Sequence, residues 1–227
     1  MTAGAEQRRE QLVELYREVS SCTRCPLHET RTKAVFGAGN ADAELMFVGE
    51  APGAEEDRQG LPFVGRAGQL LNQLLQEIGL SRDDVFIANV LKSRPPANRD
   101  PQPTEIAACK PYLFEQVRLI EPKVVCTLGN FATKLLSGSP LGITRVRGTP
   151  QIHDLGGRTV FLLPLLHPAA ALRTPAMKET LRADFATIPA LLAGPSAAPE
   201  PSAEEIAAEV EAPPQPPPAA DQMDMFG

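Results

Sequence analysis

Three polar side chains of different chemistry each follow a short apolar run of the sequence. Glu50 comes directly after one run, Asn89 lies near the end of a second, and His167 comes two residues after a third. If the runs are parallel strands, their carboxyl ends meet at one edge of a sheet, where such sheets bind ligands. A carboxylate, an amide and an imidazole at that edge could bind a small polar molecule and stabilise charge that develops on it. Taken singly, each residue could also simply end a strand or form a turn.

The four cysteines have a spacing that suggests one shared site. Cys22-x-x-Cys25 supplies two thiols close together, and Cys109 and Cys126 follow much further along the chain. This spacing fits both zinc and iron–sulfur ligation, whereas a disulfide framework fits poorly with a chain whose first residues resemble no secretion signal. Cys109, in a predicted helix, and Cys126, in a predicted strand, could instead be small core residues. Spacing alone leaves these alternatives open.

Four nearly continuous apolar runs are typical of strands that are buried on both faces. They are residues 45–49, 85–91, 124–128 and 159–165. Amphipathic helical patterns lie between and outside them, at residues 12–19, 70–78, 106–120, 131–136 and 177–192. This alternation predicts βαβ units, and hence a three-layer α/β/α sandwich around a mainly parallel four-stranded sheet. Gly156 and Gly157 predict a hairpin at one margin of the sheet.

Charge and composition divide the chain at about residue 194. Residues 195–227 hold eight prolines and seven of the 28 acidic residues but no basic residue, so we expect a disordered tail after a folded domain over residues 1–194. The domain has 22 basic against 21 acidic residues, a formal charge of +1, although the whole chain carries −6. The acidic total therefore does not exclude a nucleic-acid partner. No apolar run is long enough for a membrane span, and we expect a cytoplasmic protein.

The motifs resemble those of the family 4 uracil-DNA glycosylases. The segments that match, in the same order as in that family, are residues 49–53, 55–57, 60–68, 89–99 and 167–170, together with the four cysteines. The resemblance covers residues 10–192. It implies an α/β/α sandwich, removal of uracil from single- or double-stranded DNA, and a [4Fe–4S] cluster on Cys22, Cys25, Cys109 and Cys126. We accordingly expect a monomeric, nucleoid-associated enzyme of base excision repair.

The chemistry of uracil removal is compatible with the residues at the strand ends. Cleavage leaves negative charge on the departing base, and His167 can donate a hydrogen bond to uracil O2 as that charge develops. The amide of Asn89 can pair with uracil N3–H and O4, where cytosine presents the opposite pattern. Phe63 is a candidate platform on which the flipped base stacks. The other residues predicted to bind the base are Glu50, Ala51, Pro52 and Gly53.

The residue that positions the attacking water is less directly indicated. Uracil glycosylases that resemble this family at a distance carry a catalytic aspartate where this chain has Ala51. Either the reaction needs no strong base, or a glutamate positions the water, and we favour Glu56 over Glu50 for this role. The same distant relatives exclude the thymine methyl group with an aromatic side chain at the position of Gly53. The sequence therefore predicts that thymine is rejected by other means.

Flipping a base out of DNA is commonly assisted by an apolar side chain that enters the base stack. Leu172, shortly after His167, is the candidate for this role. Basic residues near the same edge are candidate phosphate contacts. They are Lys92, Arg94, Arg99 and Arg173. Each of them could also be an ordinary surface charge.

The end of the chain carries the one apolar cluster of the tail. Gln222, Met223, Met225 and Phe226 resemble the short peptide with which bacterial replication and repair proteins bind the sliding clamp. A disordered tether that ends in such anchors raises the concentration of an enzyme at replicating DNA. We therefore expect the clamp as a partner, although motifs of this length also arise by chance.

Two functions from other classes fit part of the sequence. One is an iron–sulfur or zinc protein that binds DNA on a glycosylase scaffold without cleaving it, and the other is an electron-transfer protein. A binding protein does not need Glu50, Phe63, Asn89 and His167 together. Widely separated cysteines in a sheet scaffold are more typical of a structural cluster than of an electron relay. The sequence therefore favours a monofunctional glycosylase that leaves an abasic site.

Overall fold

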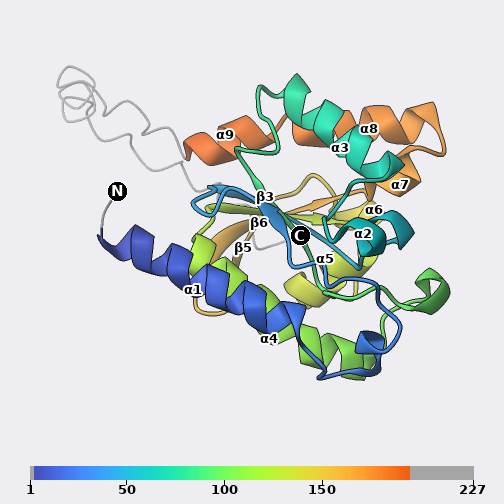
Figure 1. Ribbon diagram of the computed structural model, residues 1–227. Helices are drawn as coiled ribbons and strands as arrows, with labels where there is room; N and C mark the ends of the chain where they lie inside the picture. Colours follow the sequence, from blue (N-terminus) through green and yellow to red (C-terminus); the bar gives the residue numbers. More distant parts are fainter. Residues whose placement is uncertain (1–2, 195–227) are drawn as a thin grey trace, which may run out of the picture. The chain divides into compact units, whose positions relative to one another are not determined.

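The computed structural model describes residues 3–194 (Figure 1). The predicted tail, residues 195–227, and the clamp motif at its end lie outside the described residues. Within residues 3–194, no helix combines the length and the apolar character that a membrane crossing requires.

A six-stranded sheet forms the centre of this domain, in the strand order β1-β3-β2-β4-β6-β5. The strands are β1 (Ala38–Gly39), β2 (Leu45–Gly49), β3 (Phe86–Asn89), β4 (Val124–Leu128), β5 (Gln151–Asp154) and β6 (Thr159–Leu165). The inner four strands run parallel to one another. The predicted parallel sheet is therefore confirmed, and its inner strands are the four apolar runs of the sequence.

Two short antiparallel strands extend the sheet beyond the four that the sequence predicts. β1 pairs with β3 at one edge, and β5 pairs with β6 at the other. The β5–β6 hairpin turns at Gly156 and Gly157, whose φ angles of 66° and 84° lie in the left-handed region that favours glycine. Neither edge strand is fully buried, so neither carries the continuous apolar run that marks the inner strands.

Helices cover both faces of the sheet, which confirms the predicted three-layer sandwich. One layer consists of α1 (Ala3–Ser20), α4 (Pro103–Ile120) and α5 (Asn130–Ser137). The other consists of α3 (Arg66–Glu77), α8 (Pro175–Phe185) and α9 (Ile188–Ala193). Figure 1 shows the two layers on opposite sides of the strands. The shorter segments are α2 (Ala54–Gln59), α6 (Ile143–Val146), α7 (Pro168–Ala171), η1 (Pro26–His28) and η2 (Pro96–Asn98).

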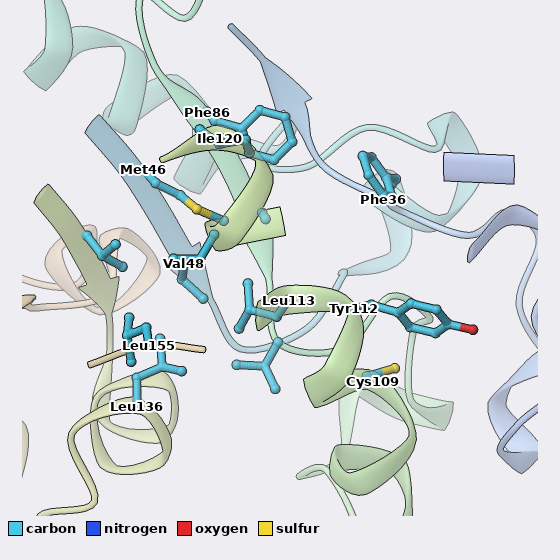
Figure 2. Packing of buried hydrophobic residues seen from close by; sticks show 14 of the residues in the cluster. Phe36, Met46, Val48, Phe86, Cys109, Tyr112, Leu113, Ile120, Leu136 and Leu155 are labelled. Carbon is cyan, nitrogen blue, oxygen red and sulfur yellow. The ribbon is translucent and has the colours of Figure 1, made fainter. Parts of the chain in front are cut away.

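Alternation along each strand divides the apolar interior into two cores. On β4, Val125 belongs to the core beneath α1 and α4, whereas Cys126 belongs to the core beneath α3 and α8. Figure 2 shows part of the first core, with Cys109 and Tyr112 of α4 near Leu113 of the same helix. A residue's place along a strand therefore decides which helical layer its side chain can reach.

Candidate active site

A pocket of about 600 Å³ opens at the carboxyl ends of the parallel strands. Glu50, Asn89 and His167 all line it, so the structure brings together the three residues at the strand ends. Glu50 comes directly after β2, Asn89 ends β3, and His167 lies two residues after β6. The other lining residues are Ala51, Pro52, Gly53, Glu56, Phe63, Ala67, Pro95, Asn98, Arg99, Ala169 and Arg173.

Asn89 is held beside β2 by the register of the sheet. It pairs with Gly49 in the parallel ladder, and only 2% of its surface is exposed. A Cβ on residue 49 would lie 2.4 Å from Asn89 Oδ1 and 2.7 Å from Phe63 Cζ, so only glycine leaves room for both side chains. Lys92 Nζ donates a hydrogen bond to the Asn89 carbonyl oxygen at 2.8 Å. The strand end therefore fixes the amide at the pocket.

The imidazole of His167 is oriented by the start of α7. His167 is the residue before this helix, and its Nδ1 accepts a hydrogen bond from the Ala169 N–H at 3.1 Å. An accepting Nδ1 assigns the ring proton to Nε2. Burial lowers the pKa of His167 to about 4, an effect that the charge of Glu56 opposes only in part. At neutral pH the ring is therefore uncharged and can donate from Nε2.

Phe63 has a φ of 51°, in the left-handed region that residues other than glycine seldom adopt. Arg82 donates to the carbonyl oxygens of Pro62, at 2.7 Å, and of Phe63, at 2.9 Å. Gly68 packs so closely that a Cβ there would lie 1.7 Å from the Phe63 oxygen. The Phe63 ring stacks with His167 at a centroid distance of 5.7 Å. Arg82 was not predicted as a site residue, because nothing near it in the sequence marks it as a contact of this loop.

Glu56 on α2 supports the same loop. Its Oε1 accepts hydrogen bonds from the backbone N–H groups of Val64, at 3.0 Å, and Gly65, at 3.1 Å, where α3 begins. Its Oε2 lies 2.7 Å from the place that a Cβ of residue 53 would take. The carboxylate therefore occupies the space that a side chain at Gly53 would fill, with one oxygen bound to the loop and the other at the pocket wall.

Glu50 lies on the side of the pocket nearest Asp100. Burial raises the pKa of Glu50, and the charge of Asp100 raises it further. A second hollow of about 520 Å³, lined in part by Asn130 and Lys134 of α5, shares both Glu50 and His167 with the pocket. The two concave surfaces therefore adjoin each other at Glu50 and His167.

Two of the five residues predicted to contact DNA, Arg99 and Arg173, line the pocket. Arg99 also forms a bidentate pair with Glu105, in which Nη1 donates to Oε2 at 2.9 Å and Nη2 to Oε1 at 2.5 Å, so both Nη groups are engaged within the protein. Leu172 follows α7, and 40% of its surface is exposed. Arg94 is half-buried. Neither Leu172 nor Arg94 is among the residues that line the pocket.

Lys92, the fifth residue, cannot contact a phosphate, contrary to the prediction. Only 2% of its surface is exposed, and its Nζ donates to the Asn89 carbonyl oxygen and, at 2.6 Å, to Gln116 Oε1. Burial lowers the pKa of Lys92 to about 7. Ser93 and Arg94 follow it in the sequence, but the side chain of Lys92 points inward, where it links β3 to α4.

The structure also separates Cys126 from the other three cysteines. Cys22, Cys25 and Cys109 lie with the core beneath α1 and α4, whereas Cys126 lies with the core beneath α3 and α8. Burial raises the pKa of the Cys109 thiol, and the charges of Cys25 and Cys22 raise it further, while burial alone raises that of Cys126. The structure thus contradicts the prediction that Cys126 completes a site with the other three, because the alternation of β4 turns it away.

A single-ion metal site is not formed among residues 3–194, where no three His, Cys, Asp or Glu side chains lie close enough to hold one ion. An iron–sulfur cluster makes a different demand, because it contains several irons and its protein ligands are shared among them. The three cysteines on one side of the sheet are the thiols that remain available for such a group.

Comparison with known proteins gives the class to which this fold and pocket belong. The family model described as the uracil DNA glycosylase superfamily matches residues 36–187. That segment contains all six strands and every residue that lines the pocket. The chain therefore belongs to the uracil DNA glycosylase superfamily. Individual relatives show which family within that superfamily it belongs to.

These relatives are type-4 uracil-DNA glycosylases. That of Sulfurisphaera tokodaii is 49% identical over 183 residues, which cover 78% of this chain and 83% of the relative. That of Thermotoga maritima is 51% identical over 167 residues, covering 73% and 85%. That of Archaeoglobus fulgidus is 45% identical over 183 residues, covering 79% and 92%. The chain belongs to the type-4 uracil-DNA glycosylases, which confirms the resemblance drawn from its motifs.

Proposed function

We propose that this chain is a monofunctional uracil-DNA glycosylase. It flips uracil out of single- or double-stranded DNA and hydrolyses the N-glycosidic bond, which leaves an abasic site for base excision repair. The observation that carries the proposal is the pocket at the strand ends, where the Asn89 amide, the Phe63 ring and a neutral His167 meet. Membership of the type-4 uracil-DNA glycosylases supports it.

Asn89 and Phe63 are proposed to recognise the base, and His167 to assist its release. Asn89 Oδ1 accepts from uracil N3–H and its Nδ2 donates to O4, while Phe63 stacks on the ring. As the C–N bond breaks, its electron pair passes to the base, and His167 Nε2–H donates to O2, where negative charge gathers. Water then adds its hydroxide to the sugar C1′, and its proton neutralises the base. A neutral imidazole suits this role, because Nδ1 is committed to accepting from Ala169.

Glu56 is proposed to position the water through Oε2. In Glu56→Gln an oxygen that can accept from Val64 and Gly65 remains, but the charge is lost. We expect kcat to fall about tenfold, with KM little changed. This decrease is smaller than the contribution of a full general base, because water readily attacks a sugar with oxocarbenium character. Single-turnover kinetics measure this. If Glu56→Gln matches the wild type while Glu56→Ala is inactive, Glu56 serves the loop alone.

The residues on the DNA side of the pocket are proposed to hold the substrate. Leu172 enters the base stack as uracil leaves it, and Arg94, Arg99 and Arg173 contact phosphates. The exposure of Leu172 and the position of Arg173 at the pocket support these roles. We also propose that the enzyme acts as a monomer.

Incubation of the purified chain with a labelled oligonucleotide that contains one uracil tests the activity. Strand breaks that appear only after alkali indicate an abasic site and a monofunctional enzyme. Matched oligonucleotides with thymine or cytosine in place of uracil should remain intact. A protein that binds the uracil oligonucleotide but releases no base would support the DNA-binding alternative instead.

We also propose that Cys22, Cys25 and Cys109 hold a [4Fe–4S] cluster beside α1 and α4. Their shared side of the sheet supports this, as does the effect of the Cys22 and Cys25 charges on Cys109. Thiolates are the usual ligands of such clusters, which are electron-transfer or structural groups. Once bound, the cluster would join the segment after α1 to α4, next to the loop that carries Arg94 and Arg99.

The sliding clamp is proposed as a partner through Gln222, Met223, Met225 and Phe226, which lie outside the described residues. Deletion of residues 222–227 should remove clamp binding in surface plasmon resonance and leave activity on short oligonucleotides unchanged, because the residues that line the pocket all lie at or before Arg173 in the sequence. Replacement of the same six residues by a Gly/Ser sequence provides a control of equal length. Clamp binding that survives both changes would contradict the proposal.

A further inference from the structure

Three cysteines leave a cluster one ligand short. A [4Fe–4S] cluster is held by four protein ligands, which are ordinarily four thiolates. Cys22, Cys25 and Cys109 lie on one side of the sheet, and the remaining cysteine, Cys126, lies on the other. The fourth ligand of a cluster at this place must therefore come from another residue type, or from a molecule other than the protein.

Ser93 is the side chain that the contacts place at this position. It directly follows Lys92, whose backbone N–H donates to Cys109 Sγ at 3.5 Å. Ser93 is buried, with 3% of its surface exposed, and its hydroxyl accepts a hydrogen bond from Arg31 Nη1 at 3.1 Å.

Other polar groups around the three thiols have hydrogen-bond partners within the protein, as Ser93 has in Arg31, and His28 is engaged through Nδ1 only. The Tyr112 hydroxyl donates to Glu18 Oε1 at 3.2 Å, and Glu105 accepts from Arg99 and from the Gln102 N–H. Nδ1 of His28 lies 2.8 Å from the Cys25 carbonyl oxygen. Serine, in contrast, has the stem of cysteine with oxygen in place of sulfur. It presents that oxygen from the same buried turn that contacts Cys109.

We propose that Ser93 Oγ is the fourth protein ligand of the [4Fe–4S] cluster, an inference that rests on the cluster proposed above. The site would then consist of three thiolates and one alkoxide. The Ser93 hydroxyl passes its proton to solvent as the Oγ–Fe bond forms, and no electron is transferred. Arg31 remains beside this oxygen and compensates part of its negative charge.

The iron that is bound to the Ser93 oxygen should leave the cluster before the three irons that are bound to cysteine sulfur. With ferricyanide as the oxidant, the cluster gives up one electron and one Fe²⁺, so that [4Fe–4S]²⁺ becomes [3Fe–4S]⁺. The three-iron product has an EPR signal that the parent cluster lacks. Its rate of appearance therefore reports on the ligand of this iron, independently of activity.

The test compares the full chain and four variants, all purified without oxygen. We expect the wild type to bind about four irons, and Cys109→Ala, which has no ligating atom at this position, to lose them. Cys126→Ala should keep the wild-type iron content. On oxidation, the three-iron EPR signal should appear about tenfold more slowly in Ser93→Cys than in the wild type, and about tenfold faster in Ser93→Ala. Changes to the residues around a metal site commonly have effects of this size.

Two results would overturn the assignment of Ser93. One is equal oxidation rates in the wild type, Ser93→Cys and Ser93→Ala, and the other is loss of iron from Cys126→Ala with a normal melting temperature. A wild-type chain that contains no iron would overturn the cluster and Ser93 together. Uracil release by the same preparation decides the glycosylase activity separately.

Discussion

Replacement of His167 by serine is expected to lower kcat on uracil-containing DNA by about 10²–10³-fold, the usual cost of one lost donor to a developing oxyanion. Serine is itself a preferred residue before a helix, so it can accept from the Ala169 N–H as Nδ1 does now. The variant should therefore keep α7 and lose only the Nε2 donor. Single-turnover kinetics with a uracil oligonucleotide measure the effect.

His153→Ser provides the matched control, because His153 lies on edge strand β5 and does not line the pocket. It should retain the wild-type rate. An unchanged rate in His167→Ser, with the abasic product still formed, would contradict the role given to the imidazole.

The pH profile of the wild type tests the protonation state of His167. Burial lowers its pKa to about 4, below the ordinary value for histidine, so the ring stays neutral as the pH falls through 6.5. Protonation at lower pH would place a proton on Nδ1 and break the contact from Ala169. We expect no loss of rate between pH 8 and pH 6 from this residue. An acidic limb centred near 6.5 that disappears in His167→Ser would show a charged imidazole instead.

Replacement of Asn89 by alanine is expected to lower kcat/KM for uracil by about 30- to 1,000-fold. Two hydrogen bonds to the base are lost, and each contributes about 1–2 kcal/mol when its partner is left unpaired in a buried site. Asn89→Asp keeps the size of the side chain but replaces the donor to O4 with an acceptor, so it should be impaired as well. Uracil release at limiting substrate concentration measures both variants.

Binding of an oligonucleotide without uracil separates recognition of the base from binding of DNA. Fluorescence anisotropy should give the same affinity for the wild type, Asn89→Ala and Asn89→Asp, because Asn89 is buried and pairs with β2. If either variant keeps the wild-type kcat/KM for uracil, the amide does not read the base.

Much of the site follows from short stretches of the chain. Apolar runs identify the inner strands, and the polar residue at the end of each run is placed by the general geometry of parallel sheets. Glu50, Asn89 and His167 could therefore be brought together without knowledge of any contact. Residue 49 has no side chain because Asn89 and Phe63 meet there, and that reason appears only in the folded chain.

The sequence by itself determined the α/β/α class, the edge of the sheet that carries the pocket and the family. These depend on periodicity and on motifs whose residues are close in the chain. Only the tertiary structure decided that Cys126 faces the layer opposite Cys109, that Lys92 is buried against Gln116, and that Arg82 holds the Phe63 loop. The physical reason is that alternation along a strand gives each side chain a face of the sheet, whereas the residues that it meets on that face come from distant parts of the chain.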